Sequence, residues 1–177
     1  MKGFTLIEII IVIVILSIIS AISIKFLVDS LRIYTMAVNQ KALFDEGKLA
    51  LERMVRDIRD ASAIAEPDAG ETVSDVRITR TNATAQDGAG EAIRFVLSGT
   101  TLQKRKTDPS IMLIDLASNV STFTATRGAS DDEITIVLTL SLTTGENVTL
   151  QTKVHPKNFG DSTTYKTYFQ NWEETRS

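Results

Sequence analysis

The sequence predicts an α+β protein in which one long N-terminal helix packs on an antiparallel β-sheet. No glycine or proline occurs between Phe4 and Glu46, and apolar residues at helical spacing continue beyond that stretch. After Pro67, the first proline of the chain, apolar and polar residues alternate in short segments. That alternation is typical of strands with one buried face. The 177 residues suit one globular domain and one additional element.

Residues 4–28 are predicted to form a transmembrane half of the helix. The stretch from Ile9 to Ile24 is uncharged, and its helix would be about 24 Å long at about 1.5 Å per residue. The apolar residues on both sides lengthen it towards the roughly 30 Å of a bilayer core, and Lys25 can reach the interface. Lys2 favours a cytoplasmic N-terminus and export of the remaining chain.

Residues 29–64 are predicted to form an amphipathic half of the same helix. Glu66-Pro67 and the following Gly70 are expected to end it. Gly47 falls on the apolar stripe, where it either lets a strand approach closely or is merely tolerated. The stripe consists of Leu27, Leu31, Tyr34, Val38, Phe44, Gly47, Leu51, Met54, Ile58 and Ala61. The opposite, charged face consists of Glu52, Arg53, Arg56, Asp57, Arg59 and Asp60.

Residues 65–177 are predicted to form an exported β-sheet domain. The clearest strand is Ile134–Leu142, in which isoleucine and leucine alternate mainly with threonine and serine. The other expected strands lie around residues 76–78, 93–97, 102–104, 111–116, 120–126 and 148–154. A sheet with one apolar face would cover the apolar stripe of the helix.

Composition argues against an enzyme and against a resident metal or cofactor. The chain has no cysteine, which excludes disulfides, thiolate metal sites and cysteine nucleophiles. His155 is the only histidine and precedes Pro156 in what should be extended chain. Neither a histidine metal cluster nor a catalytic triad is therefore expected. The net charge of −3 gives no general reason to expect a nucleic-acid partner.

Two charged runs have alternative interpretations. Asp131-Asp132-Glu133 could contribute to a calcium site, but three adjacent acids do not specify one, and a solvated turn is the preferred interpretation. Lys104-Arg105-Lys106 could contact phosphates, yet no aromatic residues interleave with it. An exposed hairpin end is preferred there.

The first eight residues carry the most specific motif. Gly3-Phe4-Thr5-Leu6-Ile7-Glu8 precedes the apolar run, and this arrangement resembles the class III leader of type IV pilins and type II secretion pseudopilins. The resemblance implies a type IV pilin-like fold and a leader of residues 1–3, and it makes residues 4–28 the filament-core half of the helix. It also implies cleavage between Gly3 and Phe4 by a prepilin peptidase, and N-methylation of Phe4 by the same enzyme. The location implied is the bacterial inner membrane, with the C-terminal domain periplasmic or extracellular.

Glu8 has two compatible interpretations. The resemblance makes it the family's near-terminal glutamate, and its carboxylate would meet the N-terminal amine of a neighbouring subunit in the membrane during assembly. Thr5 and Glu8 also have the spacing of a capping box. The small residues Ser17 and Ala21 allow close helix approach, or the serines hydrogen-bond their own helix backbone.

A second resemblance concerns the subtype. Residues 51–61, LERMVRDIRDA, are similar to the late-helix pattern of J-type minor pseudopilins and W-type minor pilins. Residues 154–158, VHPKN, resemble the basic-Asn close of their final strand, with lysine in place of the more usual arginine.

The C-terminal segment carries an aromatic stripe at positions i, i+3, i+4 and i+7. Such a stripe either covers the sheet edge of its own domain or forms an interface with another subunit or ligand, since aromatics concentrate at interface hot spots. Its members are Tyr165, Tyr168, Phe169 and Trp172.

Together these features predict a minor pilin or pseudopilin that initiates or caps a type IV pilus or type II secretion pseudopilus. Its expected partners are the prepilin peptidase, other minor and major subunits, and inner-membrane lipid, with nucleic acid an unlikely partner. The alternative is a minor pilin whose exported domain binds DNA or a surface. A plain membrane-anchored domain would not be processed at Gly3.

Overall fold

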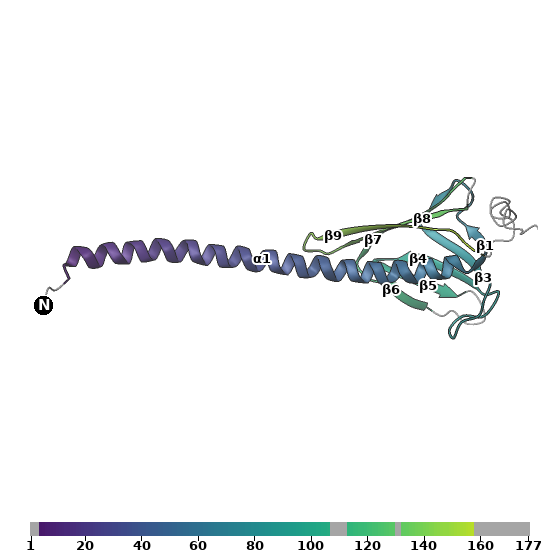
Figure 1. Cartoon of the computed structure of the whole chain (residues 1–177), viewed down its shortest axis with the longest axis horizontal. Helices are drawn as coiled ribbons and strands as arrows, with labels where there is room; N and C mark the ends of the chain where they lie inside the picture. Colours follow the sequence, from purple (N-terminus) through teal and green to yellow (C-terminus); the bar gives the residue numbers. More distant parts are fainter. Residues whose placement is uncertain (1–3, 107–112, 130–131, 158–177) are drawn as a thin grey trace, which may run out of the picture. The chain divides into compact units, whose positions relative to one another are not determined.

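The computed structural model describes residues 4–106, 113–129 and 132–157 (Figure 1). One long N-terminal helix, α1 (Leu6–Arg59), packs on antiparallel β-sheets in an α+β arrangement. The chain divides into two compact units, Met1–Lys41 and Ala42–Ser177. The second unit contains all of the strands and, among the described residues, the whole buried core.

The helix ends earlier than the sequence suggested. Residues 61–64 were expected to be helical, but α1 stops at Arg59 and strand β1 (Ala61–Glu66) follows. The Asp60 amide donates to the Asp57 carbonyl at 3.2 Å, which closes a last tight turn. Ala61 and Ile64 are buried, and β1 pairs with β3 (Asp75–Arg80). Strand pairing and burial therefore outweigh the helix propensity of this alanine-rich segment.

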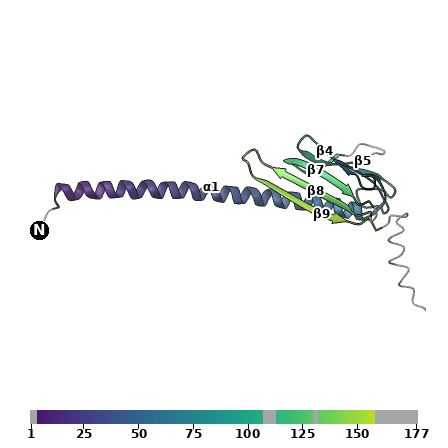
Figure 2. The same ribbon diagram turned by 90° about the horizontal axis from the view of Figure 1, so that it is seen from above.

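Two sheets occur where one was expected. The five-stranded sheet has the order β1-β3-β4-β5-β6, and the four-stranded sheet has the order β2-β7-β8-β9. All neighbouring strands pair antiparallel, and Figure 2 shows β7, β8 and β9 side by side. The remaining strands are β2 (Thr72–Val73), β4 (Ala92–Ser98), β5 (Thr101–Lys106), β6 (Leu113–Ala117), β7 (Val120–Arg127), β8 (Ile134–Ser141) and β9 (Asn147–Val154).

The chain changes sheets between β6 and β7. Only two residues separate these strands, and the second, Asn119, has a φ of 55°. Asparagine tolerates this left-handed conformation better than most residues. The Val120 amide then donates to the Thr100 carbonyl at 2.9 Å. This tight connection explains how apolar strands close in sequence belong to different sheets.

Both sheets and the second half of α1 enclose a single apolar core. The alternating burial predicted for β8 is confirmed: Ile134, Ile136, Leu138 and Leu140 are fully buried. On α1 the expected stripe is buried only from Gly47 onward. Its first four members, Leu27, Leu31, Tyr34 and Val38, were expected on the same apolar stripe but are exposed within the chain. Phe44 was expected to be buried but is 45% exposed, and Leu43 is buried instead.

The structure supports the first interpretation of Gly47, in which the missing side chain lets a strand approach the helix closely. A Cβ atom at this position would lie 2.7 Å from Cδ1 of Leu140 and 2.7 Å from Cδ1 of Leu150. Real Cβ atoms do not come this near to other carbon atoms, because dispersion contacts are optimal at about 3.5–4.0 Å. The missing side chain therefore lets α1 contact β8 and β9 directly.

Candidate functional site

The start of α1 is organised by Thr5 and Glu8. The Thr5 amide donates to Glu8 Oε2 at 2.9 Å, and the Thr5 hydroxyl donates to the same oxygen at 3.0 Å. The Glu8 amide in turn donates to Thr5 Oγ1 at 3.4 Å. This reciprocal pattern is a capping box, as the spacing predicted. Glu8 Oε2 accepts both hydrogen bonds from Thr5. Because a carboxylate can accept about four hydrogen bonds, the capping box leaves Glu8 able to accept one from a further donor.

The helix that follows presents apolar side chains around its whole circumference. Every residue from Phe4 to Asp29 is exposed within the chain, and α1 is long and apolar enough to cross a membrane. The Ser17 and Ser23 hydroxyls donate to the carbonyls of Ile13 and Ile19 at 2.7 and 2.8 Å. The backbone interpretation of these two serines is therefore confirmed, and their hydroxyls add no unsatisfied polar group to the apolar surface.

A comparison with protein families decides the nature of this segment. Residues 1–24 match the prokaryotic N-terminal methylation motif. This methylation motif is the class III prepilin leader, and it is consistent with a type IV pilin-like protein. No curated protein and no solved structure matches the chain.

The methylation motif supports a type IV pilin or pseudopilin. Its leader implies processing by a prepilin peptidase and assembly with other pilins. Together with the apolar helix, it fits a single-pass anchor in the inner membrane.

Only some of the predicted site residues lie within the described part of the chain. Phe4 is 85% exposed and lies one residue before Thr5 of the capping box. Gly3 lies outside the described residues. So do all four members of the aromatic stripe, Tyr165, Tyr168, Phe169 and Trp172.

A buried ion network, which the sequence did not predict, lies in the second unit. Its centre consists of Asp57 on α1, Arg80 on β3, Asp87 and Lys104 on β5, each at most 6% exposed. Asp57 accepts from Arg80 Nη1 at 2.5 Å and from Lys104 Nζ at 2.8 Å. Asp87 accepts from the same two cations at 3.3 and 2.5 Å. Two carboxylates and two cations therefore alternate, which balances charge in a region that excludes water.

This network corrects two expectations. Asp57 was placed on the solvent face of the helix, and Lys104 was placed at an exposed hairpin end, yet both are buried. Strand parity carried the missing signal. Arg80 follows Val76 and Ile78 at period two, and Lys104 follows Leu102, so both cations point to the buried face of their strand.

Further side chains extend the network. Burial alone would raise the pKa of Asp87, but hydrogen bonds and charges from Lys104 and Lys106 outweigh it and lower the pKa. Burial likewise opposes the lowered pKa of Asp60, which results from hydrogen bonds with Asn82 and from the Arg80 charge. For Lys106, burial would lower the pKa, and Asp87 and Glu91 raise it instead.

The acidic run near residue 132 pairs with basic side chains. Asp132 accepts from Arg127 Nη2 at 2.5 Å, and Glu133 pairs with Lys153 at 2.5 Å and with His155 at 3.1 Å. Asp131 lies outside the described residues. No group of three acidic or histidine side chains within the described ranges is arranged to hold a metal ion.

Proposed function

We propose that this chain is a minor pilin or pseudopilin that helps to initiate or cap a type IV pilus or type II secretion pseudopilus. It would act by assembly and not as an enzyme. A prepilin peptidase would cut after Gly3 and methylate the new amino terminus of Phe4. The mature chain would then associate with other minor subunits through its apolar helix.

The observation that carries the proposal is the methylation motif at residues 1–24, followed without interruption by an exposed apolar helix. An apolar surface of this extent needs lipid or other helices around it. Glu8 is the only charged side chain between Phe4 and Ile24. A charge is costly in hydrocarbon unless it is paired, which favours a role in meeting the amine of a neighbouring Phe4.

The minor-subunit assignment rests on the similarity of residues 51–61 to J-type and W-type subunits. Within this segment Leu51, Met54 and Ile58 contribute to the core, and Asp57 joins the ion network. The buried positions of this segment are constrained by their packing, whereas Glu52, Arg56 and Arg59 are exposed. Such constraint is a physical reason for subunits of one type to share its pattern.

The N-terminus of the mature protein tests the proposal. We expect mass spectrometry of membrane-extracted chain to give an N-terminal peptide that begins at Phe4 and is one methyl group heavier than the unmodified peptide. An intact Met1, or a cut at any other bond, would refute the assignment. A plain anchored domain gives the intact chain.

A pair of leader variants tests the position of the cut. A side chain at the scissile carbonyl should obstruct the approach of the peptidase, so Gly3→Val is expected to leave uncleaved precursor in the membrane. Lys2→Ala is the matched control and should be processed nearly as well as the natural chain. Normal maturation of Gly3→Val would show that the cut lies elsewhere.

A further inference from the structure

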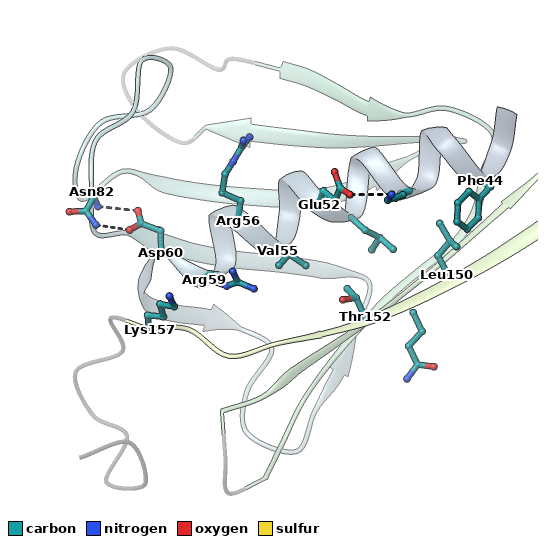
Figure 3. Close-up of a pocket in the computed structure, with 13 residues that line it drawn as sticks. Phe44, Glu52, Val55, Arg56, Arg59, Asp60, Asn82, Leu150, Thr152 and Lys157 are labelled. Carbon is teal, nitrogen blue, oxygen red and sulfur yellow. Dashed lines mark hydrogen bonds and ion pairs between the residues drawn. The ribbon is translucent and has the colours of Figure 1, made fainter. Parts of the chain in front are cut away.

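A groove of about 920 Å³ lies within the second unit between α1 and the edge strand β9 (Figure 3). Strand β9 is the last strand of its sheet, so one of its edges has no neighbouring strand among the described residues. Phe44, Leu51, Val55 and Leu150 give the groove an apolar lining. A pocket of this size is in the range of those that bury a ligand or a peptide side chain.

The apolar lining is partly open to water in the described structure. Phe44 is 45% exposed, and Val55 and Leu150 are half-buried. Val55 and Leu150 lie at the boundary of the core and pack against it. Burial of their remaining surface would be favourable, because removing apolar surface from water stabilises the buried state roughly in proportion to the area.

The described part of the chain ends beside this groove. Lys157 is the last described residue, and it lines the groove. Its amide donates to the Arg59 carbonyl, the last residue of α1, at 2.9 Å. The 20 residues that follow are therefore tethered at the groove, where a short tether gives them an effective concentration of the order of millimolar.

The tethered segment has the length and chemistry to fill the groove. From Arg59 back to Phe44, α1 extends about 22 Å at about 1.5 Å per residue, and 20 residues reach that far whether helical or extended. The segment carries four aromatic residues at helical spacing, each of which can bury 150–250 Å² or so.

Charge also favours this occupant. Four of the lining side chains are basic, namely Lys48, Arg56, Arg59 and Lys157, and two are acidic, Glu52 and Asp60. Residues 158–177 contain three acids and two basic residues. The excess of positive charge at the groove thus faces an excess of negative charge in the segment.

We propose that residues 158–177 fold back into the groove between α1 and β9, with Tyr165, Tyr168, Phe169 and Trp172 against its apolar lining. The segment is an intramolecular cover for the edge of its own domain. This proposal is independent of processing at Gly3 and of filament assembly.

Trp172 is the only tryptophan of the chain, so its fluorescence reports on the segment directly. The full chain is reconstituted in lipid nanodiscs, and acrylamide quenching of Trp172 is compared with that of the free peptide 158–177. We expect a blue-shifted emission and weaker quenching in the full chain than in the peptide. Both should be independent of protein concentration.

Substitutions in the groove identify where Trp172 is protected. Phe44→Glu adds a charge to the lining at a side chain that is already 45% exposed, so the fold should survive. It is expected to abolish the protection and return quenching to that of the free peptide. Leu49→Glu is the control, because Leu49 is 48% exposed on the same helix and does not line the groove.

Three results would overturn the proposal. Quenching in the natural chain that equals that of the free peptide means that the segment does not dock. Protection that survives Phe44→Glu means that Trp172 contacts lipid or another surface. Protection that disappears on dilution means that the groove binds the segment of a second copy.

Discussion

At the scale of single residues, Glu8 has a local role in the capping box and a proposed role between subunits. Its carboxylate completes the capping box with Thr5, and the same carboxylate is the proposed partner of a neighbouring amine. A glutamine side chain can accept the hydrogen bond from the Thr5 amide as glutamate does, but it carries no charge. The two roles are therefore separable by substitution.

We expect Glu8→Gln to be inserted and processed but to lose its association with other minor subunits. Capping persists in this variant, whereas a neighbouring amine in an apolar environment is left unpaired. Co-purification with the other minor subunits from membranes measures the loss. Thr5→Ala is the matched control, since it removes the capping hydroxyl and keeps the carboxylate, and it should retain its partners. Equal recovery of partners by Glu8→Gln and the natural chain would show that Glu8 is only a cap.

Gly47 matters because the side chains of Leu140 and Leu150 lie directly against it. We expect Gly47→Val to lower the free energy of unfolding of the second unit by about 1–3 kcal/mol, because Leu140 and Leu150 must move away from the new side chain. Chemical denaturation of a fragment that begins at Ala42 measures this change. Asp45→Val, on the exposed face of the same helix, should change the value by no more than about 0.5 kcal/mol. Equal effects of the two variants would contradict the close approach.

At the scale of elements, the ion network joins α1, β3 and β5 through charges that are buried together. Removing one cation leaves Asp57 and Asp87 with too little positive charge, and breaking a buried pair costs roughly 3–5 kcal/mol. We expect Lys104→Met, which keeps most of the side-chain volume, to destabilise the domain by an amount in this range. Lys153→Ala removes an exposed partner of Glu133 and should cost at most about 1 kcal/mol. Thermal or denaturant unfolding compares the two.

The same network predicts how stability depends on pH. Asp87 and Asp60 have a lower pKa in the folded domain than in the unfolded chain. Their contribution is therefore complete above the ordinary aspartate pKa of about 3.9 and is lost as pH falls from there through their folded values. Lys106 has a raised pKa, so its contribution is lost only as pH rises above the ordinary lysine value of about 10.4. Unfolding curves should show a stability plateau between these limits. In Lys104→Met the decline on the acid side should be smaller.

Which elements could be predicted from the sequence depends on whether their pattern was local. The alternation in β8 and the helical stripe from Gly47 onward are each contained within one segment, and periodicity predicted their burial. Periodicity did not show that the earlier part of the stripe, from Leu27 to Phe44, is exposed within the chain. Strand β1 was missed because its alanines suit a helix and only its pairing with β3 makes it a strand. The second sheet was missed because the turn at Asn119 changes the sheet without changing the pattern.

The candidate site divides in the same way. The capping box needs only two residues three apart, so spacing alone predicted it. The ion network joins Asp57, Arg80, Asp87 and Lys104 over a sequence separation of up to 47 residues, and their proximity arises only from the packing of α1 on the strands. The parity of Arg80 and Lys104 indicated their burial, but nothing in the sequence identified their partners.

At the scale of the whole molecule, the two units differ in whether their apolar side chains are buried within the chain. All of the buried apolar side chains described lie between Leu43 and Pro156, within the second unit. The apolar side chains of the first unit are exposed within the chain and contribute nothing to this core. The folding free energy of the second unit should therefore not depend on the first.

We expect a fragment that begins at Ala42 to be soluble and to unfold cooperatively, because it keeps every buried residue described. A fragment that begins at Met54 is the matched control, since it lacks Leu43, Ala50 and Leu51, and deleting a buried leucine side chain costs about 2–5 kcal/mol. It should unfold at a much lower denaturant concentration or fail to fold. Circular dichroism during urea titration compares the fragments. Failure of the longer fragment to fold would mean that residues before Ala42 stabilise the domain through interactions absent from its apolar core.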